Sequence, residues 1–152
     1  MMYEKILVAI EPGPLADSVA KMGLSLAEKE GAKVMLLHVV DPAAHSAAMD
    51  IFEPQVGHQT DELTAKAERR GRQFLDQCAR EAHLKSTPEE LVVTGRPAEE
   101  IIRMANDWHA DLVVVGSHGR SGLERLVLGS IAETILRDSS CDVLVVKKSH
   151  LR

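Results

Sequence analysis

A glycine-rich pattern around residue 116 is the part of this sequence whose residue types and spacing best suit chemistry. The apolar run Val113-Val114-Val115 ends at Gly116, a second glycine follows at Gly119, and Gly129-Ser130 comes after nine more residues. Glycines let a ligand approach the backbone closely, and the first turn of a helix carries partial positive charge. A strand, a glycine turn and a helix start therefore indicate a site for an anion such as phosphate, with the N–H groups of Gly129, Ser130 and Ile131 as donors.

The same residues have simpler structural roles. Gly116 and Gly119 are also compatible with a tight turn that binds nothing. Ser130 and Glu133 have the S-x-x-E spacing of a capping box, in which the Ser130 hydroxyl would start a helix. Spacing alone favours the cap and the ligand contact equally, and the two roles can coexist at Ser130.

The rest of the sequence predicts the scaffold that positions this pattern. Apolar runs without polar alternation indicate strands buried on both faces. Helical spacing of apolar residues separates them, so the pattern predicts an α/β fold, a doubly wound parallel sheet with helices on both faces. In such sheets ligands bind at the carboxyl ends of the strands where the strand order reverses, here between the first and fourth strands. The predicted strands are 6–10, 34–40, 90–94, 111–116 and 142–147, and the predicted helices are 15–30, 61–83, 97–105 and 130–137.

Residues 43–60 are predicted to form a long connection, and residues 1–152 a single domain. The formal net charge of -5 and the 3% of aromatic residues argue against a nucleic-acid partner. The sequence shows no apolar run of membrane-spanning length and no signal-peptide pattern, so we expect a cytoplasmic protein without a membrane partner. Cys78 and Cys141 match no C-x-x-C spacing and are expected to be inert thiols.

The spacing G-x-x-G-x(9)-G-S, formed by Gly116, Gly119, Gly129 and Ser130, resembles that of the universal stress protein family. Residues 5–10, 37–42, 95–97 and 141–146 are similar to other segments of that family, so the resemblance covers nearly the whole chain. It implies a five-stranded sheet in the order 3-2-1-4-5. It also implies a homodimer in which the last strands, Val143 to Val146, meet.

Because the glycine motif is present, the sequence resembles the branch of the family that binds ATP, with AMP or ADP as alternative ligands. The resemblance implies that a Mg²⁺ ion, where one takes part, arrives with the nucleotide phosphates, and no protein metal site is expected. Phosphates would be held by Gly116, Gly119, Gly129, Ser130 and Ile131, with Ser117, His118 and Arg120 lining the loop. Ala9, Ile10, Val39 and Val115 would lie against the rest of the nucleotide, Val39 through its backbone.

Glu11 departs from the family pattern, which usually has Asp after the first strand. A carboxylate at this position is expected to contact ribose or adenine. Glu11 keeps the charge but is one methylene longer, and Pro12 and Pro14 stiffen the turn. The alternative role for Glu11 is that of a solvated loop carboxylate.

No set of residues predicts catalysis. Ser117 and His118 are neighbours in the chain rather than a nucleophile and base brought together, and the lysine motif of P-loop proteins is absent. His38 and His118 lack partners at metal-ligand spacing, which favours structural roles. We therefore expect a nucleotide-binding regulatory protein of the stress response, with at most weak ATP hydrolysis. The alternatives are a slow ATPase or other nucleotide-dependent enzyme, and an interaction module that senses AMP or ADP.

Overall fold

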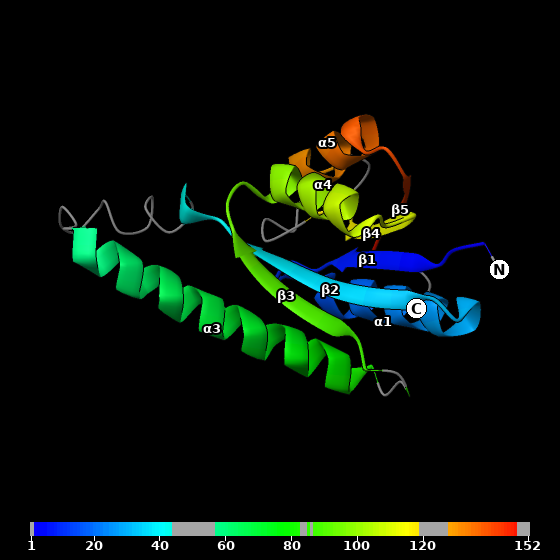
Figure 1. The fold of residues 1–152 in the computed structure, drawn as a ribbon, viewed down its shortest axis with the longest axis horizontal. Helices are drawn as coiled ribbons and strands as arrows, with labels where there is room; N and C mark the ends of the chain where they lie inside the picture. Colours follow the sequence, from blue (N-terminus) through cyan, green and yellow to red (C-terminus); the bar gives the residue numbers. More distant parts are fainter. Residues whose placement is uncertain (1, 44–56, 83–84, 86, 119–127, 149–152) are drawn as a thin grey trace.

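The strands of this protein form one parallel sheet in the order β3-β2-β1-β4-β5 (Figure 1). The structure is a computed structural model that describes residues 2–43, 57–82, 85, 87–118 and 128–148. Both the predicted fold class and the predicted strand order are confirmed. The strands are β1 (Lys5–Ala9), β2 (Lys33–Val40), β3 (Glu89–Thr94), β4 (Leu112–Gly116) and β5 (Asp142–Val146). The helices are α1 (Ala16–Glu30), α3 (Gly57–Glu81), α4 (Pro97–Trp108) and α5 (Ser130–Asp138).

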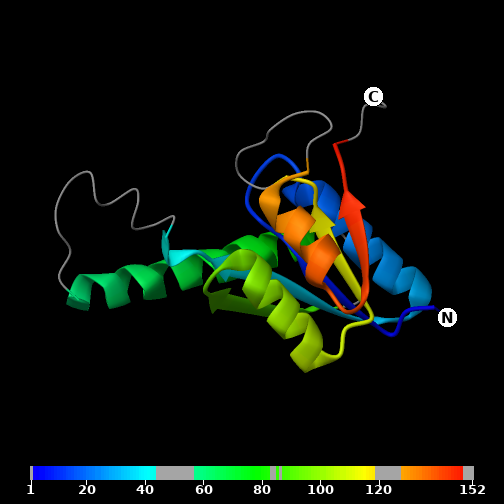
Figure 2. The same cartoon turned by 90° about the horizontal axis from the view of Figure 1, so that it is seen from above.

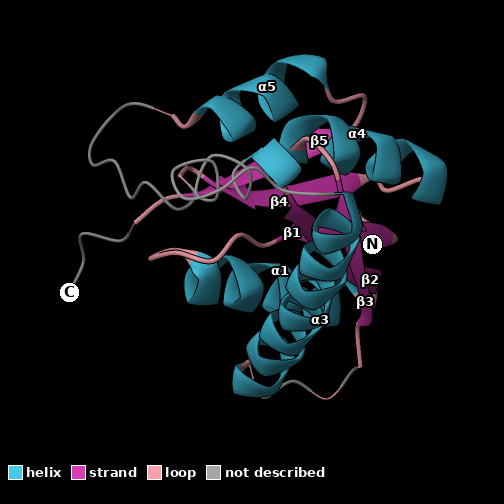
Figure 3. Cartoon of the chain, turned by 90° about the vertical axis from the view of Figure 1, so that its left-hand side faces the viewer, coloured by secondary structure: helices cyan, strands magenta, loops and turns pink. Residues whose placement is uncertain are grey.

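Helices cover both faces of the sheet, which explains why its central strands are apolar throughout (Figures 1 and 3). On β1, Ile6 and Val8 pack into the cluster that includes residues of α1 and α3. Leu7 and Ala9 point to the opposite face and pack into the cluster formed with α4 and α5. The alternation of side chains along one buried strand thus links two hydrophobic clusters.

Most predicted boundaries agree with the structure to within two residues, but the end of α4 lies three residues later than predicted and the start of α3 lies four residues earlier. This 25-residue helix begins at Gly57, so the prediction that residues 57–60 belong to a connection is wrong. A glycine at the first position of a helix interrupts no internal hydrogen bond and therefore does not end it. At this end α3 extends beyond the edge of the sheet (Figure 2). The remainder of the predicted connection, 44–56, lies outside the described residues.

Two glycines inside helices allow close packing on the sheet. A Cβ atom at Gly23 in α1 would lie 2.4 Å from Val8 Cγ2, and one at Gly71 in α3 would lie 2.8 Å from His38 Cδ2. Glycine costs helix stability of about 1 kcal/mol relative to alanine. The close approach of α1 to β1 and of α3 to β2 explains why both helices contain one.

Within the described part of the chain, no helix combines the length and apolarity needed to cross a membrane.

Both cysteines are free, and Cys78 is buried where α3 packs on the core. Burial, reinforced by the negative charges of Asp17, Glu81 and Glu90, raises the pKa of the Cys78 thiol to about 11. Since thiolate is the reactive form, this environment keeps Cys78 unreactive near neutral pH.

The Cys78 environment predicts a distinctive alkylation profile. In a Cys141→Ser variant, we expect iodoacetamide to label folded Cys78 at pH 8 roughly 100-fold more slowly than the urea-unfolded chain. The folded-state rate should keep rising with pH toward 11, whereas the unfolded-state rate levels off near an ordinary thiol pKa. Mass spectrometry after timed quenching measures both profiles. Two profiles that level off at the same pH would contradict the burial effect on Cys78.

Candidate functional site

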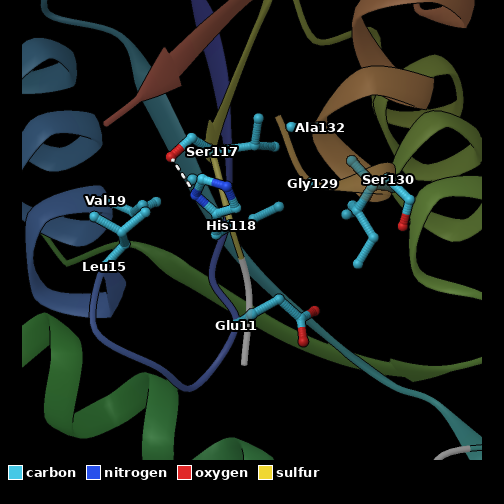
Figure 4. A pocket seen from close by; sticks show the side chains of 13 residues that line it. Glu11, Leu15, Val19, Ser117, His118, Gly129, Ser130 and Ala132 are labelled. Carbon is cyan, nitrogen blue, oxygen red and sulfur yellow. Dashed lines mark hydrogen bonds between the residues drawn. The ribbon is translucent and has the colours of Figure 1, made fainter. Parts of the chain in front are cut away.

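A cavity of about 160 Å³ opens at the carboxyl ends of β1 and β4, where the strand order reverses (Figure 4). Leu15 and Val19 border it on the α1 side, Ser130 lies on the α5 side, and Glu11 lies below them in this view. This is the edge of the sheet at which the sequence predicts a ligand. The lining residues are Ala9, Glu11, Leu15, Val19, Ile101, Val115, Gly116, Ser117, His118, Gly129, Ser130, Ile131 and Ala132.

The N-terminus of α5 forms one wall of this cavity. Gly129 is the N-cap residue, with φ -64° and ψ 158°, and no side chain caps the helix. Of the two roles left open for Ser130, the capping role is therefore not the one found, since Ser130 is the first residue of the helix itself. The first hydrogen bond across this turn runs from the Glu133 N–H to the Gly129 carbonyl at 3.0 Å. By helix geometry, the N–H groups of Ser130, Ile131 and Ala132 have no acceptor within α5.

The backbone N–H of Gly129 is hydrogen-bonded within the protein. It donates to the Ser117 carbonyl, just after β4, at 2.7 Å. An anion would therefore have to compete with Ser117 for this N–H, and its predicted role as an anion donor stays a prediction. A Cβ at Gly129 would lie 3.0 Å from Ser117 O and 3.5 Å from His118 Cα. Glycine is needed here because the start of α5 packs directly on the Ser117 peptide.

Gly116 is also constrained by packing. A Cβ at this position would lie 3.2 Å from Val19 Cγ2, 3.3 Å from the His118 carbonyl and 3.5 Å from Leu15 Cδ1. The absence of a side chain therefore lets both α1 and the following loop approach the end of β4. This supports the turn role proposed for Gly116, while its backbone still lines the cavity.

The side chains of Ser117 and His118 contact each other beside the cavity. Ser117 is 4% exposed, and its Oγ lies 3.2 Å from His118 Nδ1 (Figure 4). His118 Nε2 is buried and has no hydrogen-bond partner among the described residues. Among the described residues, no group of three or more His, Cys, Asp or Glu side chains is placed to share a metal ion. His38 has the predicted structural role, because its Nδ1 lies 3.1 Å from the Ile10 carbonyl in the core and its ring meets Phe74 edge-on.

Not all predicted site residues line the cavity. The predicted residues that line it are Ala9, Glu11, Val115, Gly116, Ser117, His118, Gly129, Ser130 and Ile131. Ile10 and Val39 do not: Ile10 is fully buried in the α1 cluster, and Val39 lies in the α4 and α5 cluster. Gly119 and Arg120 lie outside the described residues.

Four lining residues were absent from the predicted site: Leu15, Val19, Ile101 and Ala132. The helical pattern does predict Val19, Ile101 and Ala132 to face inward. Nothing in that pattern distinguishes a residue packed in the core from one at the end of a strand beside a cavity. Leu15 follows Pro14 just before α1, and only the folded position of the β1–α1 turn brings it to the site.

Solved structures place this fold among known doubly wound α/β proteins. A structure of the protein MJ0577 superposes with a TM-score of 0.79 at 27% identity, covering 99% of each chain. A universal stress protein in complex with cAMP aligns with a TM-score of 0.66 at 23% identity, covering 98% of this chain and all of that one. One from Archaeoglobus fulgidus in complex with dAMP aligns with a TM-score of 0.65 at 20% identity, covering 97% of this chain and all of that one. At these lower identities the likeness shows the fold.

Sequence comparison identifies the family to which this chain belongs. The profile of the Universal stress protein family matches residues 2–147. Universal stress protein YxiE of Bacillus subtilis is 31% identical over 150 residues, which cover 96% of this chain and all of YxiE. Universal stress protein MJ0531 of Methanocaldococcus jannaschii is 33% identical over 149 residues, covering 97% of this chain and 84% of that protein. The chain therefore belongs to the universal stress protein family.

The geometry at the start of α5 predicts a loss of stability for one alanine substitution and almost no change for its neighbour. Gly129→Ala should destabilise the fold by about 1–3 kcal/mol, because the new Cβ is overpacked against the Ser117 peptide. Ser130→Ala should change stability by less than about 0.5 kcal/mol, since Ser130 is exposed and does not cap the helix. Urea unfolding followed by circular dichroism measures both. A loss of about 1 kcal/mol in Ser130→Ala would instead indicate a capping serine.

Proposed function

We propose that this protein binds an adenine nucleotide in the cavity between β1 and β4, with the phosphates at the N-terminus of α5. The observation that carries this proposal is that Ser130, Ile131 and Ala132 line the cavity with the turn whose N–H groups lack acceptors within α5. Such a turn attracts anions through its N–H groups and its partial positive charge. The G-x-x-G-x(9)-G-S motif, typical of the ATP-binding branch, supports ATP as the ligand.

The solved relatives named above in complex with cAMP and dAMP support an adenine nucleotide as the ligand class. In the proposed complex, Ala9 and Val115 form apolar walls beside the base or sugar, and Glu11 accepts a hydrogen bond from ribose or adenine. A Mg²⁺ ion would arrive with the phosphates. Arg120, together with the glycine at 119, completes the predicted phosphate contacts. The proposal includes a regulatory role, in which the bound nucleotide acts as the signal and is not rapidly hydrolysed.

Ser130 allows a direct test of the backbone donors. Gly129 has the extended backbone that a residue before proline requires, and proline is well tolerated at the first helical position. Ser130→Pro should therefore keep α5 but remove one N–H, and we expect ATP affinity to fall about 10-fold or more. Ser130→Ala keeps the N–H and serves as the matched control, with a smaller loss. Isothermal titration calorimetry measures both, after thermal unfolding has shown that the variants fold.

The nucleotide itself is identified by chromatography of the supernatant after the purified protein is denatured. We expect an adenine nucleotide to be released, and we expect heats of binding with ATP, ADP or AMP. A Ser130→Pro variant that binds ATP as tightly as the unchanged protein would place the phosphates elsewhere. No released nucleotide, together with no heat from any adenine nucleotide, would overturn the proposal.

We also propose that the protein forms a homodimer through β5. Within the described residues β5 pairs only with β4, which leaves one edge of the strand open. Its apolar residues Val143, Leu144 and Val145 are only partly buried, so pairing with a second copy would cover them.

Two edge strands of the same sheet provide a controlled test of this dimer. A charge placed on an edge strand opposes pairing, so Leu144→Lys on β5 should convert the dimer to a monomer. Leu91→Lys on β3, the other edge, makes the same change to a half-buried leucine and should leave the dimer intact. Sedimentation velocity measures the mass of each. Dimer loss only in Leu91→Lys would move the interface to β3.

A further inference from the structure

The Ser117 peptide joins the start of α5 to the end of β5. Its N–H donates to the Val146 carbonyl at 2.8 Å, and its carbonyl accepts the Gly129 N–H at 2.7 Å. Gly116 pairs with Val146 at the end of the parallel ladder, so the Ser117 bond extends the pairing of β4 and β5 by one step. The two backbone groups of one residue, on either side of the Ser117 Cα, therefore connect the helix turn that lines the cavity with the last residue of an edge strand.

This connection is tight on both sides. Ser117 is 4% exposed, and Gly129 packs so closely on it that a Cβ would lie 3.0 Å from the Ser117 carbonyl. The Ser117 side chain lies within hydrogen-bond distance of His118 Nδ1, which leaves its backbone as the link between the two elements. A displacement of the α5 N-terminus must therefore move the Ser117 peptide or break a short hydrogen bond.

The two edges of the sheet differ in this respect. At the end of β3, the Gly95 N–H donates to the Val40 carbonyl at 2.9 Å, which extends the pairing at the opposite edge of the sheet by one step, with the donor on the edge strand. No bond among those found in the described residues ties Gly95 to α5. The structure thus contains a matched pair of strand-end hydrogen bonds, of which only one is linked to the cavity.

We propose that Ser117 is a positioning residue that couples ligand occupancy at the α5 N-terminus to the order of β5. This inference rests on the proposed nucleotide site. An anion bound by the first N–H groups of α5 fixes Gly129, and through it the Ser117 peptide and its bond to Val146. Since such coupling is reciprocal, any partner that orders the end of β5 also strengthens ligand binding.

Amide hydrogen exchange tests this coupling in the full chain. Protection of the Ser117 and Gly95 amides is measured by NMR with and without saturating ATP. General stabilisation by a ligand protects both amides. We expect ATP to increase protection of Ser117 at least about fivefold more than protection of Gly95. An equal change at both amides, no change, or a fall at Ser117 would overturn the coupling.

Two α5 variants sharpen the test. Gly129→Ala crowds the Ser117 carbonyl and should abolish the selective protection of Ser117 by ATP. Thr134→Ala removes a 2.8 Å hydrogen bond to the Ser130 carbonyl within the same helix, touches neither Ser117 nor Gly129, and should retain that protection. Selective protection that persists in Gly129→Ala would contradict the route through Gly129.

Calorimetry on the same samples separates this inference from the proposed function. Absence of heat with ATP, ADP and AMP overturns the nucleotide site and the coupling with it. Binding of ATP with equal protection of Ser117 and Gly95 retains the nucleotide site and overturns the coupling alone. Should Gly129→Ala fail to fold, the comparison of the two amides in the unchanged protein still decides the outcome.

Discussion

The direct contact between Gly129 and the Ser117 peptide is the constraint on which the candidate site depends. It brings the first turn of α5 against the end of β4 with no side chain between them. The cavity exists beside this contact because α1 approaches the same strand end from the other face, over Gly116. Two glycines are thus required by packing of protein on protein, and the cavity lies beside that packing.

This changes the physical interpretation of the glycine motif. A glycine beside a presumed phosphate is usually explained by the space that the ligand needs. Here a Cβ at Gly129 would meet backbone atoms of the protein, and the Gly129 N–H is already used by Ser117. The donors left for an anion are those of the following residues, beginning with Ser130. The motif therefore encodes the placement of a helix start first, and the chemistry of the site follows from that placement.

The sequence predicted the architecture well because its signals are strong and local. Continuous apolar runs at β1, β2, β4 and β5 indicated strands of a sheet that is covered on both faces, and their alternation with helical patterns predicted the parallel sheet. Local signals were ambiguous at helix ends. Gly57 suggested a break where α3 begins, and the S-x-x-E spacing at Ser130 left open a capping role that Gly129 takes instead. The wrong start and the open alternative share one cause, because the exact start of a helix depends on tertiary contacts that short-range spacing does not record.

The candidate site, like the fold, could be predicted from the sequence only in part. The spacing of the glycine motif and the switch point of the sheet predicted its position, and Ala9, Glu11 and Val115 were predicted to line it. Leu15 and Ile101 could not be assigned to it from the sequence, because their apolar character is equally suited to the core. Ile10 shows the converse problem, since its place directly after β1 suggested the site while its side chain is fully buried in the core. Position along a strand predicts nearness to the site, but core packing decides which side chains reach it.

The charge pattern of the described lining completes the physical argument for the ligand class. Glu11 is its only charged side chain among the residues that the structure describes, and it lies apart from Ser130 at the α5 N-terminus (Figure 4). The Glu11 carboxylate favours hydrogen-bond donors, whereas the α5 N-terminus favours an anion. Apolar residues from β1, β4 and α4 also line the cavity. A ligand that matches this lining carries hydroxyl or amino donors, an apolar ring surface and an anionic group, and a nucleotide carries all three.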